Sequence, residues 1–147
     1  MFELLKNHIR PEFSGINESN IEWTIGNIGE SLLVIQYGKD METIDWEEAE
    51  KLLQEYVVRA FLYVKEETQA IDAEIMASYP KEAGSIMSMI NSMGGYINGD
   101  LAHYMDNIPM DVIILVLQWY IQTIVMYGID CGHAWIEHWM DPDPDAE

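Results

Sequence analysis

The sequence predicts a mostly helical α+β protein, in which an N-terminal helix and a β-hairpin precede a helical bundle. Apolar residues recur every three or four positions from Trp46 to Val64, the spacing of an amphipathic helix, and Ile71 and Ile75 stay in phase with them. Residues 112–127 form a second, almost wholly apolar segment of 16 residues. Shortly after the N-terminus, apolar and polar residues alternate, as in a half-buried strand.

The chain has 147 residues, of which 49% are hydrophobic, enough for one domain with a core of its own. We expect a single globular domain over residues 1–140. The last seven residues, DPDPDAE, alternate acid and proline and are expected to form a flexible acidic tail. The N-terminal decapeptide interleaves charge with apolar residues and does not resemble a signal peptide, so a cytoplasmic protein is expected.

The first 40 residues predict a helix and a hairpin. Residues 2–9 are amphipathic and end at Arg10-Pro11, a helix-stopping pair. Residues 21–25 alternate apolar and polar side chains, GNIG at 26–29 is a turn signal, and LLVIQY at 32–37 is a second apolar run. Together they predict a β-hairpin.

Residues 46–78 predict the long amphipathic helix. Asp45 or Thr43 can cap it, and Asp45 with Glu48 resembles a capping box. Its expected buried stripe has helical spacing throughout: Trp46, Ala49, Leu53, Val57, Ala60, Val64, Ile71 and Ile75. The segment is expected to be either one helix of about 33 residues or two helices with a break near 66–68.

The second half predicts shorter helices around one buried apolar helix. Residues 85–93, 101–105 and 134–140 are short helix candidates. An apolar helix over 108–127, capped by Asn107 and ended by Gly128, is expected in the core. Its apolar run is shorter than the ~20 residues of a membrane span. A polar line formed by Asp111, Gln118 and Gln122 favours a core helix.

The charge of the chain is strongly and unevenly negative. The net charge is −19, from 26 acidic and seven basic residues. All seven basic residues fall within residues 1–81, and residues 82–147 hold ten acidic residues and no Lys or Arg. Such a chain repels nucleic-acid backbones and anionic membranes, so its expected partners are basic surfaces.

The amphipathic helix and the later half carry the predicted partner-binding carboxylates: Glu47, Glu48, Glu55, Glu66, Asp72, Asp100, Asp106 and Asp111. Residues four apart on a helix are ~6 Å apart along its axis, which is of the order of the phosphate spacing of a nucleic-acid strand. The competing interpretation is an ordinary solvated helix face. Lys51 lies one turn from Glu47 and Glu48, and Arg59 one turn from Glu55, as in common intrahelical pairs.

Residues 44–56, IDWEEAEKLLQEY, resemble an acidic helix of the Ocr-type phage antirestriction proteins, which imitate DNA. The resemblance covers 13 of the 147 residues. It implies inhibition of a defence nuclease through occupation of its DNA site. After this segment the chain turns apolar at Val57 and Val58, whereas proteins of that type continue with a longer acidic run.

The candidate metal ligands lie mainly near the C-terminus. His133 and Glu137 share a helical face but His138 does not, and His103 would join them only through the fold. Cys131 has no motif of a catalytic thiol around it. The sequence therefore predicts no catalytic residue, no metal and no cofactor.

The function expected from these features is that of a non-catalytic acidic inhibitor of a basic, nucleic-acid-handling protein, such as an antirestriction or anti-CRISPR protein. An immunity protein for a nuclease toxin fits the same charge. A small dimeric chaperone or adaptor is the alternative of another class, because ten methionines can form an adaptable self-association surface. A small enzyme or metal protein centred on His103, His133 and His138, and an acidic protein adapted to high salt, are the further alternatives.

Overall fold

The computed structural model describes residues 3–40, 42–78 and 109–132, and over these ranges the protein is helical with no β-strand. The elements in chain order are α1 (Glu3–His8), the 3-10 helix η1 (Pro11–Phe13), α2 (Ile21–Ser31), the π-helix η2 (Leu32–Gln36), α3 (Trp46–Tyr63), α4 (Lys65–Ser78) and α8 (Met110–Asp130). The expected helices 85–93, 101–105 and 134–140 and the tail 141–147 lie outside the described residues.

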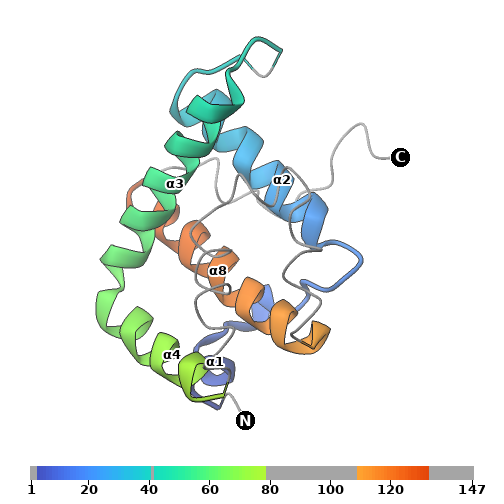
Figure 1. Ribbon diagram of the computed structural model, residues 1–147, viewed down its shortest axis with the longest axis vertical. Coiled ribbons are helices and arrows are strands. Elements are labelled where there is room, and N and C mark those ends of the chain that lie inside the picture. Colours follow the sequence, from blue (N-terminus) through green and yellow to red (C-terminus); the bar gives the residue numbers. More distant parts are fainter. Residues whose placement is uncertain (1–2, 41, 79–108, 133–147) are drawn as a thin grey trace.

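Helix α8 lies at the centre of the described structure (Figure 1) and contacts α1, η1, α2 and α3. Within the described residues it is long and apolar enough to cross a membrane by length and composition. However, 67% of its most apolar 18-residue window is buried inside the protein. Buried apolar side chains cover most of the circumference of the helix, as in the core helix of a globular protein.

The polar line on α8 fastens the N-terminal segment to the core. Gln122 donates to the His8 carbonyl at 2.6 Å and accepts from the Arg10 amide at 2.6 Å. One helical repeat earlier, Gln118 donates to the Ile16 carbonyl at 2.8 Å. These two amides satisfy backbone groups in a stretch that has little regular structure of its own.

The predicted β-hairpin is wrong, and with it the α+β class, because residues 21–36 form α2 and then η2. Ile21, Ile25, Ile28 and Leu32 are all buried, and they recur every three or four residues. This helical spacing overlaps the short alternation at 21–25 and determines which side of the segment faces the core. The expected GNIG turn lies inside α2.

Residues 46–78 form two helices, with the break at Val64. Val64 has φ −115° and ψ 48°, outside the helical region, and lies slightly before the expected position at 66–68. Thr68 Oγ1 donates to the Phe61 carbonyl at 3.1 Å, which satisfies an acceptor at the end of α3. Most of the expected stripe is buried, but Trp46 is 47% exposed and does not belong to the core.

Aromatic rings join α3 to α8. Phe61 meets Trp119 edge to face with ring centroids 5.0 Å apart, and it stacks on Tyr120 at 6.0 Å. About two turns farther along α8, Tyr127 meets Tyr56 edge to face at 5.4 Å. Such pairs contribute about 0.5–1.5 kcal/mol each beyond the area they bury. They hold α3 in one orientation on the core.

Helix α8 does not end at Gly128, which is buried within it. It continues to Asp130, and Gly132 follows with φ +82°, the left-handed conformation that closes many helices. Pro109 occupies the N-cap position. The expected cap, Asn107, lies outside the described residues.

Candidate acidic binding surface

The start of α3 carries the densest group of acidic side chains in the described structure. Asp40, Glu42, Asp45, Glu47 and Glu48 are all exposed, in the loop before α3 and in its first turn; we call these five residues the acidic end. Asp45 caps α3, because its Oδ1 accepts from the Glu47 amide at 3.1 Å. Glu47 and Glu48 lie in the first turn, where the helix dipole favours negative charge.

The intrahelical ion pairs expected on α3 do not form. Glu48 pairs instead with Lys39 in the preceding loop, with 2.6 Å between its Oε1 and the lysine Nζ. Within the described residues, Lys51 has no carboxylate within 4.0 Å. The Lys39 contact ties the loop to the first turn of α3 and leaves Glu47 without an ion pair among these residues.

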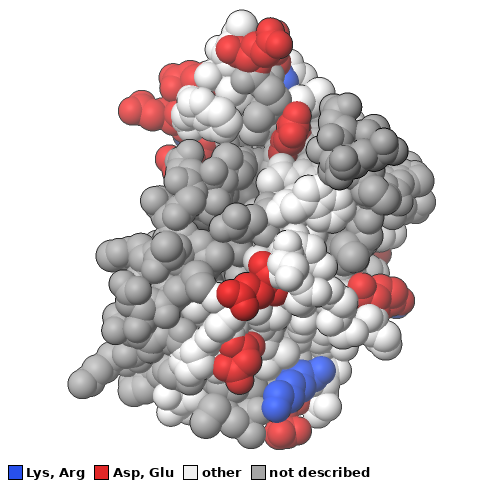
Figure 2. Space-filling view, turned by 90° about the vertical axis from the view of Figure 1, so that its right-hand side faces the viewer, with Lys and Arg blue, Asp and Glu red and all other residues white. Residues whose placement is uncertain are grey.

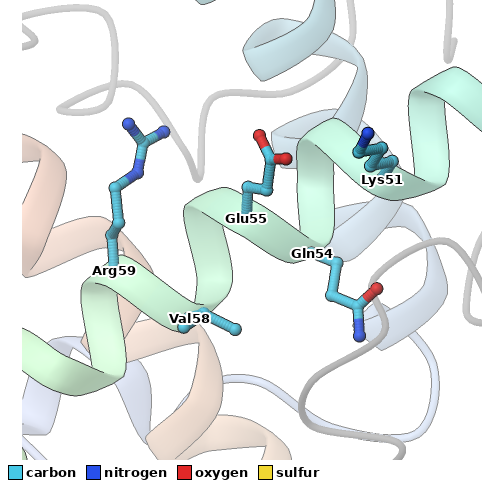
Figure 3. Close-up of a pocket in the computed structure, with 5 residues that line it drawn as sticks. All are labelled: Lys51, Gln54, Glu55, Val58 and Arg59. Atoms are coloured by element: carbon cyan, nitrogen blue, oxygen red, sulfur yellow. The ribbon is translucent and has the colours of Figure 1, made fainter.

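Arg59 binds tyrosines rather than Glu55. Its Nη2 donates to the Tyr37 hydroxyl at 2.7 Å, and its guanidinium lies 5.7 Å from the centre of the Tyr56 ring. Burial raises the pKa of Tyr37, and the nearby Arg59 charge opposes this shift. Figure 3 shows Arg59 and Glu55 projecting from the same side of α3 around a pocket of about 550 Å³.

On α4, the two predicted site residues lie in different surroundings. Glu66 is exposed in the first turn, whereas Asp72 is half-buried. Asp72 lines a groove of about 310 Å³ at the α3–α4 break, and within the described structure its Oδ1 is buried without a hydrogen-bond partner. This burial raises the pKa of the Asp72 carboxyl.

The predicted carboxylates do not form one continuous surface. Asp111 is exposed in the first turn of α8, at the end of that helix far from the start of α3 (Figure 1). The helix is about 30 Å long at 1.5 Å per residue. Asp100 and Asp106 lie outside the described residues. Figure 2 shows that the acidic side chains on the face in view form separate groups, one of them at the end of the molecule where α3 begins.

Two carboxylates outside the predicted set have defined roles. Glu74 on α4 accepts from the backbone amides of Leu4 at 3.0 Å and Leu5 at 2.9 Å, and so caps the start of α1. Glu67 lies 3.8 Å from the Nε2 of His8. No local sequence signal identifies these contacts, because the partners of Glu74 are about 70 residues away.

Cys131 is exposed just after α8, beside Tyr127. The pKa of Tyr127 is raised, first by burial and then by this thiol, and Asp130 raises the pKa of Tyr63. Within the described ranges no three His, Cys, Asp or Glu side chains converge as metal ligands. The candidate metal ligands of the sequence, His103, His133, Glu137 and His138, lie outside those ranges.

Comparison with known proteins found no matching family model, no matching curated protein and no matching solved structure.

Proposed function

We propose that this protein is a non-catalytic inhibitor that binds a basic, nucleic-acid-handling protein through its acidic end. The observation that carries the proposal is the exposure of five carboxylates in the nine residues from Asp40 to Glu48, of which only Glu48 has an ion-pair partner in the described structure. The net charge of −19 adds a long-range field of the same sign. An antirestriction or anti-CRISPR protein would use such a surface.

The local structure suits this role because it holds the charges in place. Asp45 is fixed by its cap, Glu48 by Lys39, and the Asp40 carboxylate by a hydrogen bond of 2.9 Å from the Glu42 amide. Carboxylates held in advance lose less conformational entropy on binding than free side chains do. Complementary charge also raises the association rate and disfavours partners of the wrong sign.

The test begins with the immobilised chain and an extract of its source cell, from which a bound basic protein is eluted by salt and identified. The purified partner is then titrated with the chain at several salt concentrations, alone and with a DNA duplex as competitor. We expect affinity to fall by about tenfold or more between 50 and 200 mM salt, since the contacts are largely electrostatic. We also expect the duplex to compete.

A matched pair of variants locates the surface. Glu42→Gln with Glu47→Gln removes two charges from the acidic end, and Glu18→Gln with Glu30→Gln removes two exposed charges elsewhere. We expect the first pair to weaken binding about tenfold and the control pair less than twofold. Equal effects of the two pairs, or binding indifferent to 0.5 M salt, would rule out the proposal.

An immunity protein for a nuclease toxin would present the same surface, and the identity of the captured partner separates it from an antirestriction or anti-CRISPR protein.

The alternative function, that of an adaptor, is supported by an exposed apolar surface. Val34 and Ile35 on η2 are exposed although both are large and apolar. An adaptor that uses them would bind an apolar peptide with little salt dependence, and Ile35→Ser would abolish that binding while the acidic-end variants would not.

A further inference from the structure

The outward side of α3 and α4 carries a second surface, distinct from the acidic end. Seven residues spaced alternately four and three apart share this side, the spacing of residues that face a partner helix in a coiled coil. We call them the outer stripe: Lys51, Glu55, Val58, Leu62, Lys65, Gln69 and Asp72. All except the half-buried Asp72 are exposed.

The middle of the outer stripe is apolar and hollowed. Val58 is 41% exposed and Leu62 is 60% exposed, one helical turn apart. Val58 lines the pocket of about 550 Å³ that it shares with Glu55 (Figure 3). Val58 also lines the groove of about 310 Å³ that it shares with Leu62 and Lys65. The two hollows are therefore neighbours, and Lys65 stays on this side despite the break at Val64.

Charges of opposite sign flank the apolar pair. Glu55 precedes it and Lys65 follows it, and neither forms an ion pair among the described residues. Arg59 lies one helical turn after Glu55 on α3, but it donates to the Tyr37 hydroxyl instead of pairing with Glu55. Glu55 and Lys65 are thus available to charges on another molecule.

The order of these residues is self-complementary. Positions 55 and 65, and positions 58 and 62, are equally spaced about residue 60. When two copies of α3 lie antiparallel with a twofold axis at that level, Val58 meets Leu62 of the other copy. The same register brings Glu55 opposite Lys65, twice, as in an isologous interface. We propose that the outer stripe is the interface of a homodimer in this register.

The net charge of the chain makes this face the suitable one for self-association. Two copies of charge −19 repel each other, so an interface must lie where the local field is weakest. Half of the six Lys and Arg residues in the described ranges lie on or beside the outer stripe, namely Lys51, Arg59 and Lys65. The acidic end remains free for a different partner.

The first experiment measures mass against concentration by sedimentation. A contact made by one helix stripe belongs to the weak class of interfaces, so we expect a dissociation constant of about 10–100 µM. Leu62→Asp, at an exposed position, should abolish the dimer while leaving the far-UV circular dichroism and melting of the monomer unchanged. A parent protein that stays monomeric up to about 500 µM, fivefold above that range, overturns the proposal.

A charge exchange tests the register. Glu55→Lys and Lys65→Glu should each weaken the dimer at least about fivefold, because each places like charges together twice. The double variant restores both pairs and should return to within about twofold of the parent. Glu47→Lys, which changes the net charge as Glu55→Lys does, should not weaken the dimer. Failure of the double variant to recover overturns the register, and equal loss with Glu47→Lys overturns the surface.

Salt separates this inference from the proposed function. Screening of the repulsion between two acidic chains should strengthen the dimer about threefold or more between 20 and 150 mM salt. Binding of a basic partner weakens over the same range. A dimer that weakens as salt rises contradicts the assignment of the interface to the least acidic face.

Discussion

At the scale of single residues, Gln122 joins parts of the chain that are distant in sequence. Its buried amide serves two backbone groups, the His8 carbonyl and the Arg10 amide. Gln122→Leu keeps the approximate volume and removes both hydrogen bonds, so we expect a loss of about 2–4 kcal/mol in the free energy of unfolding. Urea denaturation measures it. Gln54→Leu, at an exposed position on α3, is the control and should change stability by less than about 0.5 kcal/mol.

Glu74 stabilises α1 from outside that helix. Its two carboxylate oxygens accept from the Leu4 and Leu5 amides, at the end where the helix dipole favours negative charge. Glu74→Gln removes the charge and one acceptor, and should cost about 1 kcal/mol; Glu74→Ala should cost about 2 kcal/mol. Hydrogen exchange of the α1 amides should rise in both variants, and an unchanged rate would contradict the cap.

Asp72 should make stability depend on pH. Burial raises the pKa of its carboxyl in the folded protein. The folded state therefore binds the proton more tightly than the unfolded state, and this contribution is lost as pH rises from ~3.9, the ordinary value, through the raised pKa. Asp72→Asn should be more stable than the parent at pH 7, by less than about 1 kcal/mol because the side chain is only half-buried.

The pH series provides the check on Asp72. Denaturation of both proteins should show the advantage of Asp72→Asn shrinking as the pH is lowered from 7 towards about 4. Glu66→Gln, on the same helix but exposed, is the matched control. A constant difference between Asp72→Asn and the parent across this range would contradict the raised pKa.

At the scale of elements, a side-chain hydroxyl contributes a hydrogen bond at the break between α3 and α4. Thr68 Oγ1 satisfies the Phe61 carbonyl, which the change of direction at Val64 leaves without a helical partner. Thr68→Val keeps the shape and removes the hydroxyl, so we expect a loss of about 1–2 kcal/mol. Thr68→Ser retains the donor and should lose clearly less. Chemical denaturation measures the free energy of unfolding of both variants. Equal losses of stability in the two would contradict a role of the hydroxyl.

Elements with long, regular apolar spacing were the most predictable from the sequence. The helices within 46–78 and at 110–130 have buried residues that recur at helical spacing over several turns. The short helix α1 has one buried residue, Leu5, and was predicted instead from its amphipathic sequence and the stop at Arg10-Pro11.

The hairpin predicted around residues 26–29 was wrong, because Gly26 and Gly29 indicated a turn and residues 21–25 alternate between apolar and polar side chains. Ile21, Ile25, Ile28 and Leu32 recur every three or four residues, and this longer pattern indicates the helix that is observed.

The surface was less predictable than the fold. Sequence spacing placed Lys51 and Arg59 within reach of acids on the same helix, but Arg59 binds Tyr37, which is 22 residues away. Glu48 likewise pairs with Lys39, across the loop before α3. Such partners are chosen by tertiary packing, which intrahelical spacing does not describe.

At the scale of the whole molecule, excess negative charge should weaken the fold. Among the described residues, Arg10 pairs with Glu12 and Lys39 with Glu48, whereas the net charge of the chain is −19. Moderate salt screens the repulsion more than it weakens these few pairs, so the melting temperature should rise by several degrees between 10 and 200 mM NaCl. Calorimetry at low protein concentration measures this, with equal osmolality of sucrose as the control. A constant or falling melting temperature would contradict it.

The hydrogen bonds of Gln122 also constrain how the protein is made. They join His8 and Arg10 to a residue 114 and 112 positions later. Until Gln122 has been synthesised, the N-terminal segment lacks the side-chain amide that binds it, and α1 lacks the helix α8 that covers it. At 5–20 residues per second this interval lasts roughly 5–25 s. The nascent chain therefore spends most of its synthesis with Leu5 and Phe13, both core residues, exposed to chaperones and proteases.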